Sequence, residues 1–167
     1  GLTTNETYPA QLQKMLNDSG YKYEVVNAGV SGDTTSGGLR RMDWVLDEQV
    51  KFVILELGAN DILRGQPIEL LQQNLSKMIE SMQSRNITVI LAGMEAPTNS
   101  GPEYRKEVHE AYRTLAQKYN TPFIPFILQD VVQSENYTQE DLSHPNVEGA
   151  KILAKTVFDI LQPLLTK

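Results

Sequence analysis

Short apolar runs alternate with amphipathic segments along this chain, and this alternation restricts the fold more than any other feature. Residues 52–57 are almost all apolar, as expected of a parallel strand that is covered on both faces. Similar β-rich runs occupy residues 23–27, 88–92 and 122–126. Strands separated by helices imply right-handed crossovers, so the pattern predicts an α/β fold with a parallel sheet and helices on both faces.

The segments between these runs carry apolar side chains at helical spacing. In the first segment Leu12 and Leu16 lie on one face of a helix, Pro9 favours its start and Gly20 favours its end. We therefore expect a first helix between these two signals. Further helices are predicted around residues 39–46, 70–82, 104–119 and 147–161.

Length and composition exclude several classes of protein. The chain has 167 residues, of which 40% are apolar, and we expect residues 1–167 to form one domain with one core. A net charge of -6 offers no obvious basic face for nucleic acid, which is therefore not an expected partner. The chain has no cysteine, which excludes disulfides, thiolate metal sites and a cysteine nucleophile. No apolar run approaches the roughly 20 residues that span a bilayer.

Two polar, glycine-containing turns follow predicted strands, at residues 28–34 and 58–61. Ligands of parallel sheets bind outside the carboxyl ends of the strands, so these turns are candidates for chemistry. Acyl transfer needs donors for a negatively charged oxygen, and Gly32 offers a backbone N–H and Asn60 a side-chain amide. Taken singly, each residue is equally explained as ordinary turn chemistry.

The chain has two histidines, so a histidine base is a choice between His109 and His144. His109 lies in an amphipathic segment among charged residues and is interpreted as a solvated surface residue. His144 follows Asp141 by three residues, in a loop before the last predicted helix. A carboxylate at this spacing can accept from Nδ1–H and leave Nε2 as the base, although a helix cap beside an exposed histidine has the same pattern.

Three segments taken together resemble a known family of hydrolases. Residues 27–34 (NAGVSGDT), 56–61 (ELGAND, followed by LRG) and 141–146 (DLSHPN) resemble the second, third and fifth conserved blocks of the SGNH, or GDSL-type, hydrolases. The resemblance runs nearly end to end and is nearest to the bacterial arylesterase and acyl-CoA thioesterase I-like (lysophospholipase-like) branch. It implies a three-layer flavodoxin-like fold with a parallel sheet of order 2-1-3-4-5.

The resemblance also assigns roles to four residues. It makes His144 the catalytic base and Asp141 the carboxylate that orients it, with Gly32 and Asn60 as oxyanion donors. The family's nucleophile is a serine in a first block, Gly-Asp-Ser-Leu, which is absent from this sequence and is expected upstream of Gly1 together with the first strand. Ser31 lies next to the presumed oxyanion glycine, but the family does not use a residue at that place to attack.

Two further features have a plain and a functional interpretation. Residues 94–102 resemble the family's mobile segment beside the acyl pocket, with Ser100 where an aromatic residue is common, or form an ordinary Pro/Gly loop. Trp44 shares a predicted helix with apolar residues, which favours packing over substrate contact.

The sequence and the resemblance together predict a serine hydrolase of carboxylic esters. The expected substrates are short-chain or aryl esters, and further thioesters and lysophospholipids, all small-molecule or lipid esters. Neither a metal nor an organic cofactor is implied, and the family suggests a periplasmic or secreted bacterial protein. One alternative is a catalytically inactive binding protein with the same fold. Another is a flavodoxin-like protein that binds phosphate with residues 29–38.

Overall fold

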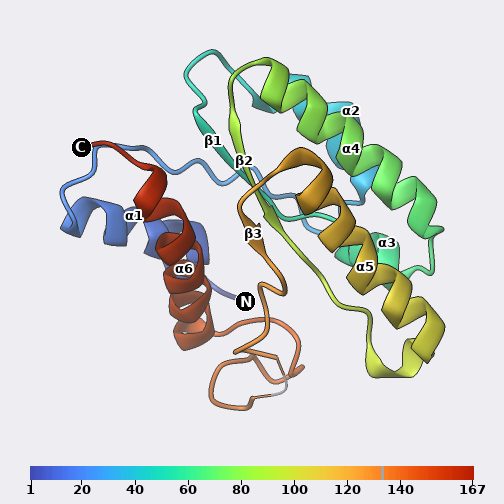
Figure 1. Cartoon of the computed structure of the whole chain (residues 1–167). Coiled ribbons are helices and arrows are strands. Elements are labelled where there is room, and N and C mark those ends of the chain that lie inside the picture. Colours follow the sequence, from blue (N-terminus) through green and yellow to red (C-terminus); the bar gives the residue numbers. More distant parts are fainter. Residues whose placement is uncertain (133) are drawn as a thin grey trace. The chain divides into compact units, whose positions relative to one another are not determined.

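The computed structural model describes residues 1–132 and 134–167 (Figure 1). These residues form two compact units. The sheet unit consists of Ala28–Phe126, and the terminal unit consists of Gly1–Asn27 with Ile127–Lys167. Each unit is described by itself below.

The sheet unit contains three parallel strands in the order β1-β2-β3. They are β1 (Phe52–Leu55), β2 (Thr88–Ala92) and β3 (Phe123–Ile124). Each strand comes from a run of apolar residues, and the whole of β2 after its first residue is buried. The parallel sheet of the sequence prediction is confirmed, and these strands are numbers 3, 4 and 5 of the predicted order.

The helices of the sheet unit precede β1 or lie between its strands along the chain, as Figure 1 shows. They are α2 (Thr35–Val45), α3 (Ala59–Leu63), α4 (Ile68–Ser84) and α5 (Pro102–Tyr119), with a short 3-10 helix, η2 (Thr98–Ser100). The α4 helix packs against α2, α5 and β2. Its buried residues Leu71, Leu75, Met78 and Met82 recur every three or four positions, so one continuous apolar face covers its neighbours.

The turn predicted after the run of residues 52–57 is instead the start of α3. Gly58 precedes that helix with a φ of 121°, a conformation that L side chains rarely adopt. A Cβ at Gly58 would lie 2.0 Å from the Tyr112 hydroxyl oxygen, so the position also lacks space for a side chain. That hydroxyl donates to the Leu57 carbonyl at 2.6 Å, and burial raises the pKa of Tyr112 and keeps it protonated.

The terminal unit consists mainly of two helices that pack against each other, α1 (Tyr8–Asp18) and α6 (Val147–Leu161). Short 3-10 helices, η1 (Thr4–Glu6) and η3 (Gln162–Leu164), adjoin them. The apolar stripe predicted for the first helix is confirmed, because Leu12 and Leu16 are buried. An isolated antiparallel bridge pairs Thr138 with Pro145 in the loop before α6.

The strand predicted at residues 23–27 is wrong, because this segment has no strand structure. A strand needs a ladder of main-chain bonds, and in the predicted order its neighbour is strand 1, which the resemblance places before Gly1. The Gln13 side chain makes two hydrogen bonds to the main chain of this segment instead. Its amide donates to the Tyr23 carbonyl at 2.8 Å, and its oxygen accepts from the Val25 N–H at 2.6 Å.

The predicted packing of Trp44 is also wrong. Its side chain lies on α2 and is 92% exposed, whereas Met42 on the same helix is buried. Helical spacing alone did not separate the two faces correctly, because Trp44 lies two residues after Met42 and so faces away from the core. None of the helices in the described part of the chain has both the length and the apolar character needed to cross a membrane.

Candidate active site

The first candidate element is the loop before α2, where Gly32 was predicted to donate its backbone N–H. The Asp33 N–H donates to the Val30 carbonyl at 3.2 Å, which closes a turn with Gly32 at its third position. Gly32 has a φ of 79°, and a turn with positive φ at this position favours glycine. A Cβ at Gly32 would meet no atom within 4 Å, so the backbone angle rather than crowding requires glycine.

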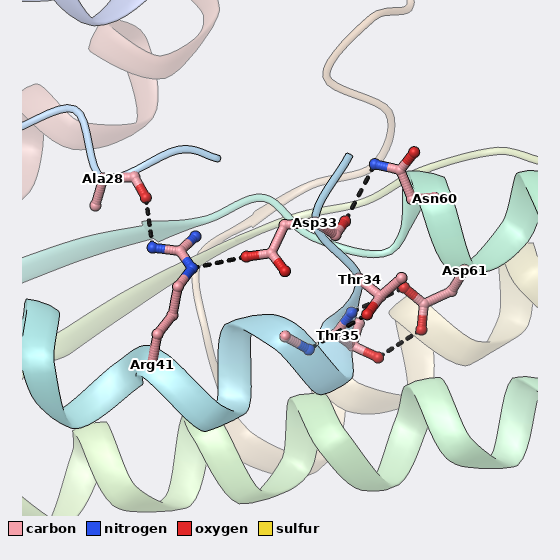
Figure 2. A network of polar contacts seen from close by, with 8 residues as sticks. Ala28, Asp33, Thr34, Thr35, Arg41, Asn60 and Asp61 are labelled. Carbon is pink, nitrogen blue, oxygen red and sulfur yellow. Dashed lines mark hydrogen bonds and ion pairs between the residues drawn. The ribbon is translucent and has the colours of Figure 1, made fainter. Parts of the chain in front are cut away.

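An arginine holds this loop to α2. The Arg41 Nε–H donates to an Asp33 carboxylate oxygen at 2.7 Å, and its terminal nitrogen donates to the Ala28 carbonyl at 2.7 Å (Figure 2). Both ends of the loop are therefore bonded to one side chain. The Thr34 hydroxyl accepts from the Gly37 N–H at 3.3 Å and caps α2, so the loop leads directly into a capped helix.

Asn60, the second predicted oxyanion donor, lies in α3 and reaches the same loop. Its side-chain amide donates to the Asp33 carbonyl at 3.1 Å (Figure 2). This bond uses one amide hydrogen and fixes the plane of the amide, and the amide carries a second hydrogen. The structure thus brings Asn60 to the residue that directly follows Gly32. Arg64, which directly follows α3, donates to the Gly32 carbonyl at 3.2 Å.

A buried polar cluster, which the sequence analysis did not predict, joins α3, the start of α2 and α4. The Asp61 carboxylate is 2% exposed and accepts from the Thr35 N–H at 2.8 Å and from the Thr35 hydroxyl at 2.6 Å. Asn74, from α4, donates to the Thr35 hydroxyl oxygen at 3.0 Å. The available signal was Asp61 itself, a charged residue directly before the apolar pair Ile62 and Leu63.

The terminal unit holds the predicted histidine and its carboxylate. His144 Nδ1 lies 2.5 Å from an Asp141 carboxylate oxygen. The other carboxylate oxygen accepts from the backbone N–H groups of Ser143 and His144, each at 3.0 Å. The backbone N–H of His144, together with the imidazole and the Ser143 N–H, holds the pKa of Asp141 well below its usual range. A carboxylate at this place stays ionised and accepts the Nδ1 proton.

The loop around this pair is fixed by main-chain and amide bonds. The Gln139 N–H donates to the His144 carbonyl at 2.8 Å, and Leu142 adopts a left-handed φ of 57°. The Asn146 side chain caps α6 by accepting from the Gly149 N–H at 2.9 Å, and its amide donates to the Thr138 carbonyl at 3.1 Å. The histidine therefore lies between an ordered turn and a capped helix, although its own side chain is 74% exposed.

His109 lies at the surface, as the sequence predicted, with its side chain 43% exposed, but it is bonded on both ring nitrogens. Its Nδ1 lies 2.6 Å from a Glu95 carboxylate oxygen, and Arg113 Nε–H donates to its Nε2 at 2.8 Å. The sequence did not predict these two bonds. Glu95 follows β2 and is 14 positions away along the chain, so the helical pattern around His109 gave no sign of it.

The four predicted site residues fall into two pairs. Gly32 and Asn60 belong to the sheet unit, where Asn60 bonds Asp33, the residue directly after Gly32. Asp141 and His144 belong to the terminal unit and bond each other directly. Among the residues that the structure describes, 1–132 and 134–167, no group of three or more histidine, aspartate or glutamate side chains is placed to hold a metal ion.

Residues 1–152 match the family described as GDSL-like Lipase/Acylhydrolase. The chain is 40% identical over 166 residues to Esterase TesA of Pseudomonas aeruginosa, which covers 99% of this chain and 83% of that protein. It is 32% identical over 166 residues to Thioesterase 1/protease 1/lysophospholipase L1 of Escherichia coli, covering 98% and 78%. The solved structure of the psychrotrophic esterase EstA from Pseudoalteromonas sp., inhibited by monoethylphosphonate, is 29% identical, covers 100% of this chain and 92% of that one, and has a TM-score of 0.92.

The fold and these relatives define an ester hydrolase of the α/β class that works as a serine hydrolase. The chain belongs to the GDSL-like lipase/acylhydrolase family. The family, the fold class and the class of reaction that the sequence predicted are confirmed.

Proposed function

We propose that this protein hydrolyses carboxylic esters through an acyl-enzyme, with His144 as the base and Asp141 as its orienting carboxylate. The nucleophile in this proposal is a serine that the family places before Gly1. His144 Nε2 takes the serine proton as the hydroxyl attacks the ester carbonyl, and returns it to the leaving alcohol. Water then releases the acyl group by the same two proton transfers. The observation that carries the proposal is the 2.5 Å contact between His144 Nδ1 and Asp141.

The geometry of that pair supports the proton transfers. An ionised Asp141 accepts the Nδ1 proton, so the neutral imidazole keeps its lone pair on Nε2. When His144 becomes an imidazolium during attack, the same carboxylate stabilises its charge. The two backbone N–H groups that bond Asp141 hold the carboxylate in place for this task.

We assign the stabilisation of the tetrahedral oxyanion to the backbone N–H of Gly32 and the amide of Asn60. The bond from Asn60 to the Asp33 carbonyl supports the assignment, because it connects the two donors through a single residue and leaves an amide hydrogen for the substrate. Loss of one such donor typically lowers kcat by about 100- to 1000-fold. The substitution Asn60→Ala tests this assignment, with KM expected to change little.

For substrates, we infer short-chain or aryl esters, together with thioesters and lysophospholipids. The names of the relatives support this range, since one is an esterase and another is a thioesterase and lysophospholipase. We also infer that residues 1–167 act as one hydrolase domain. The family match supports this, because residues 1–152 include parts of both units.

An active-site probe tests the proposed function directly. The full-length purified protein is incubated with a fluorophosphonate, and its intact mass is compared before and after. One adduct, mapped to a serine before Gly1, together with hydrolysis of p-nitrophenyl acetate, is the expected result. A protein without adduct or hydrolysis contradicts the proposal and leaves the inactive binding protein. An adduct on Ser31 contradicts the assignment of the nucleophile alone.

A further inference from the structure

The proposed oxyanion donors lie above a buried carboxylate to which no role in the reaction has been given above. Asp61 is 2% exposed, and each of its carboxylate oxygens accepts a hydrogen bond from Thr35. Thr35 is fully buried, and its hydroxyl oxygen also accepts from Asn74. A buried charge is costly unless its oxygens are bonded, and here both are.

The placement of Asp61 suits the start of a helix. Thr35 is the first residue of α2, and the first N–H groups of a helix have no partner within the helix. A carboxylate at this end also complements the helix dipole. These terms explain how the structure tolerates Asp61, and they apply to any buried carboxylate at a helix start. They do not explain why the carboxylate comes from the residue next to Asn60.

Two consecutive residues of α3 bond the loop that carries Gly32 and the start of α2 that directly follows it. Asn60 donates to the Asp33 carbonyl, and Asp61 accepts from Thr35, two residues further on (Figure 2). The two contacts fix both the distance and the register between α3 and the loop. If the Asp61 contacts were lost, α3 would still be bonded to the loop through Asn60, and Arg64 would still donate to the Gly32 carbonyl, but the start of α2 would no longer be bonded to Asp61.

We propose that Asp61 is a positioning residue for the oxyanion site. Its bonds to Thr35 hold the loop of Gly32 against α3, so that the Gly32 N–H and the Asn60 amide keep a fixed separation. This inference rests on the proposed function, because it assumes that these two groups bind the oxyanion. Donors of this kind must hold their geometry to within about 0.5 Å, which gives a buried tether a direct effect on rate.

The substitution Asp61→Asn changes this tether with little change in shape. The remaining oxygen can still accept from the Thr35 N–H, while the new amide faces the Thr35 hydroxyl, which then has no acceptor for its own hydrogen. In the full-length protein we expect kcat for p-nitrophenyl acetate to fall by about tenfold or more, with KM changed less than about twofold, because only the transition state carries the oxyanion. The melting temperature should also fall.

A double-mutant cycle separates positioning from simple support of the fold. Because Asp61 acts through the oxyanion donors, Asp61→Asn should lower kcat by less than about threefold when Asn60→Ala is already present. Its effect on the melting temperature should persist in that background. An undiminished loss of kcat in the Asn60→Ala background overturns the proposal.

Two further variants keep the test decisive. Thr35→Val removes the hydroxyl contacts to Asp61 and Asn74 and keeps the bond from the Thr35 N–H to Asp61. It should lower kcat in the same direction by a smaller factor, which covers the case in which Asp61→Asn does not fold. Met82→Ala, in the buried face of α4 two turns beyond Asn74, is the matched control for lost stability. An equal loss of kcat in Met82→Ala at the same melting temperature contradicts positioning.

A wild-type protein without hydrolysis contradicts the proposed function, whereas an active wild type with unchanged Asp61→Asn and Thr35→Val variants contradicts this inference alone.

Discussion

Each unit of this protein holds one histidine bonded to a carboxylate, and the two pairs differ at the second ring nitrogen. In the sheet unit Glu95 lies 2.6 Å from His109 Nδ1, and Arg113 donates to Nε2 at 2.8 Å. In the terminal unit Asp141 lies 2.5 Å from His144 Nδ1. No bond to Nε2 of His144 is found among residues 1–132 and 134–167.

The difference decides which histidine is suited to be a base. The Arg113 Nε–H group can only donate, so His109 Nε2 must accept and its lone pair is already in use. His109 therefore carries its proton on Nδ1 and links Glu95 to Arg113 as a structural bridge. His144 has the same proton arrangement with its lone pair directed away from the carboxylate. A histidine and a carboxylate in contact are thus not enough for catalysis, because the opposite nitrogen must remain available.

The largest effect should come from removing each histidine in turn. We expect His144→Ala to lower kcat by about a million-fold in the full-length protein, since the base of a serine hydrolase has an effect of this size. His109→Ala should change kcat by less than about threefold. Initial rates with p-nitrophenyl acetate, calibrated by fluorophosphonate titration of active serines, measure both variants. Comparable losses in the two variants would remove the distinction between the pairs.

The two carboxylates should differ by a smaller factor. Asp141→Asn places an amide donor opposite Nδ1, which favours the imidazole tautomer with its proton on Nε2 and removes the base. Such a change typically lowers kcat by about 10,000-fold. Glu95→Gln makes the same exchange at His109 and should leave kcat within about threefold. Near-wild-type activity in Asp141→Asn contradicts the role of Asp141, and circular dichroism spectra of both variants check that the fold is kept.

The comparison also shows what the sequence could reveal. Asp141 and His144 are three residues apart, so local spacing made their contact predictable, and the resemblance named their roles. Glu95, in the loop after β2, and His109, on α5, meet through the tertiary fold of the sheet unit, and no local pattern records that. The same reasoning applies to Asp61, whose partner Thr35 is 26 positions away.

The fold was predictable to a similar extent. Each of the three strands that formed comes from an apolar run, and α6 has the predicted bounds because Asn146 caps it and its apolar stripe is regular. The segment 23–27 has strand composition but lacks a ladder in this structure, since strand formation depends on a neighbour as well as on propensity. The prediction that Trp44 packs in the core was wrong for a related reason. The helix period shows which residues share a face but not which face is covered.

The pH dependence of activity sharpens the comparison further. The pKa of Asp141 is lowered chiefly by the His144 backbone N–H, so the carboxylate stays ionised as the pH falls through the range where a free aspartate takes up a proton. Its contribution to stability is present above the unfolded pKa and is lost only as the pH falls toward the folded one. Protonation of Asp141 should therefore add no second proton to the acid limb of kcat/KM in that range. A slope of two protons contradicts this, and Glu95→Gln should leave the limb unchanged.

The smallest effect on stability and activity should come from replacing Arg113, whose bond to His109 Nε2 is the difference between the two histidine pairs. Arg113→Leu frees His109 Nε2 and gives that histidine the same arrangement as His144. The lost bond is exposed, so we expect a loss of stability of about 1 kcal/mol or less and a melting temperature lower by about 2–4 °C or less. Arg105→Leu, on the exposed surface of the same helix, is the matched control. Scanning calorimetry measures the shift, and kcat should stay unchanged in both variants.

An Arg113→Leu, His144→Ala double variant tests whether an available Nε2 is sufficient for a base. We expect no hydrolysis, because His109 does not hold the place in the fold that His144 holds. Recovered hydrolysis would show that an available Nε2 is sufficient.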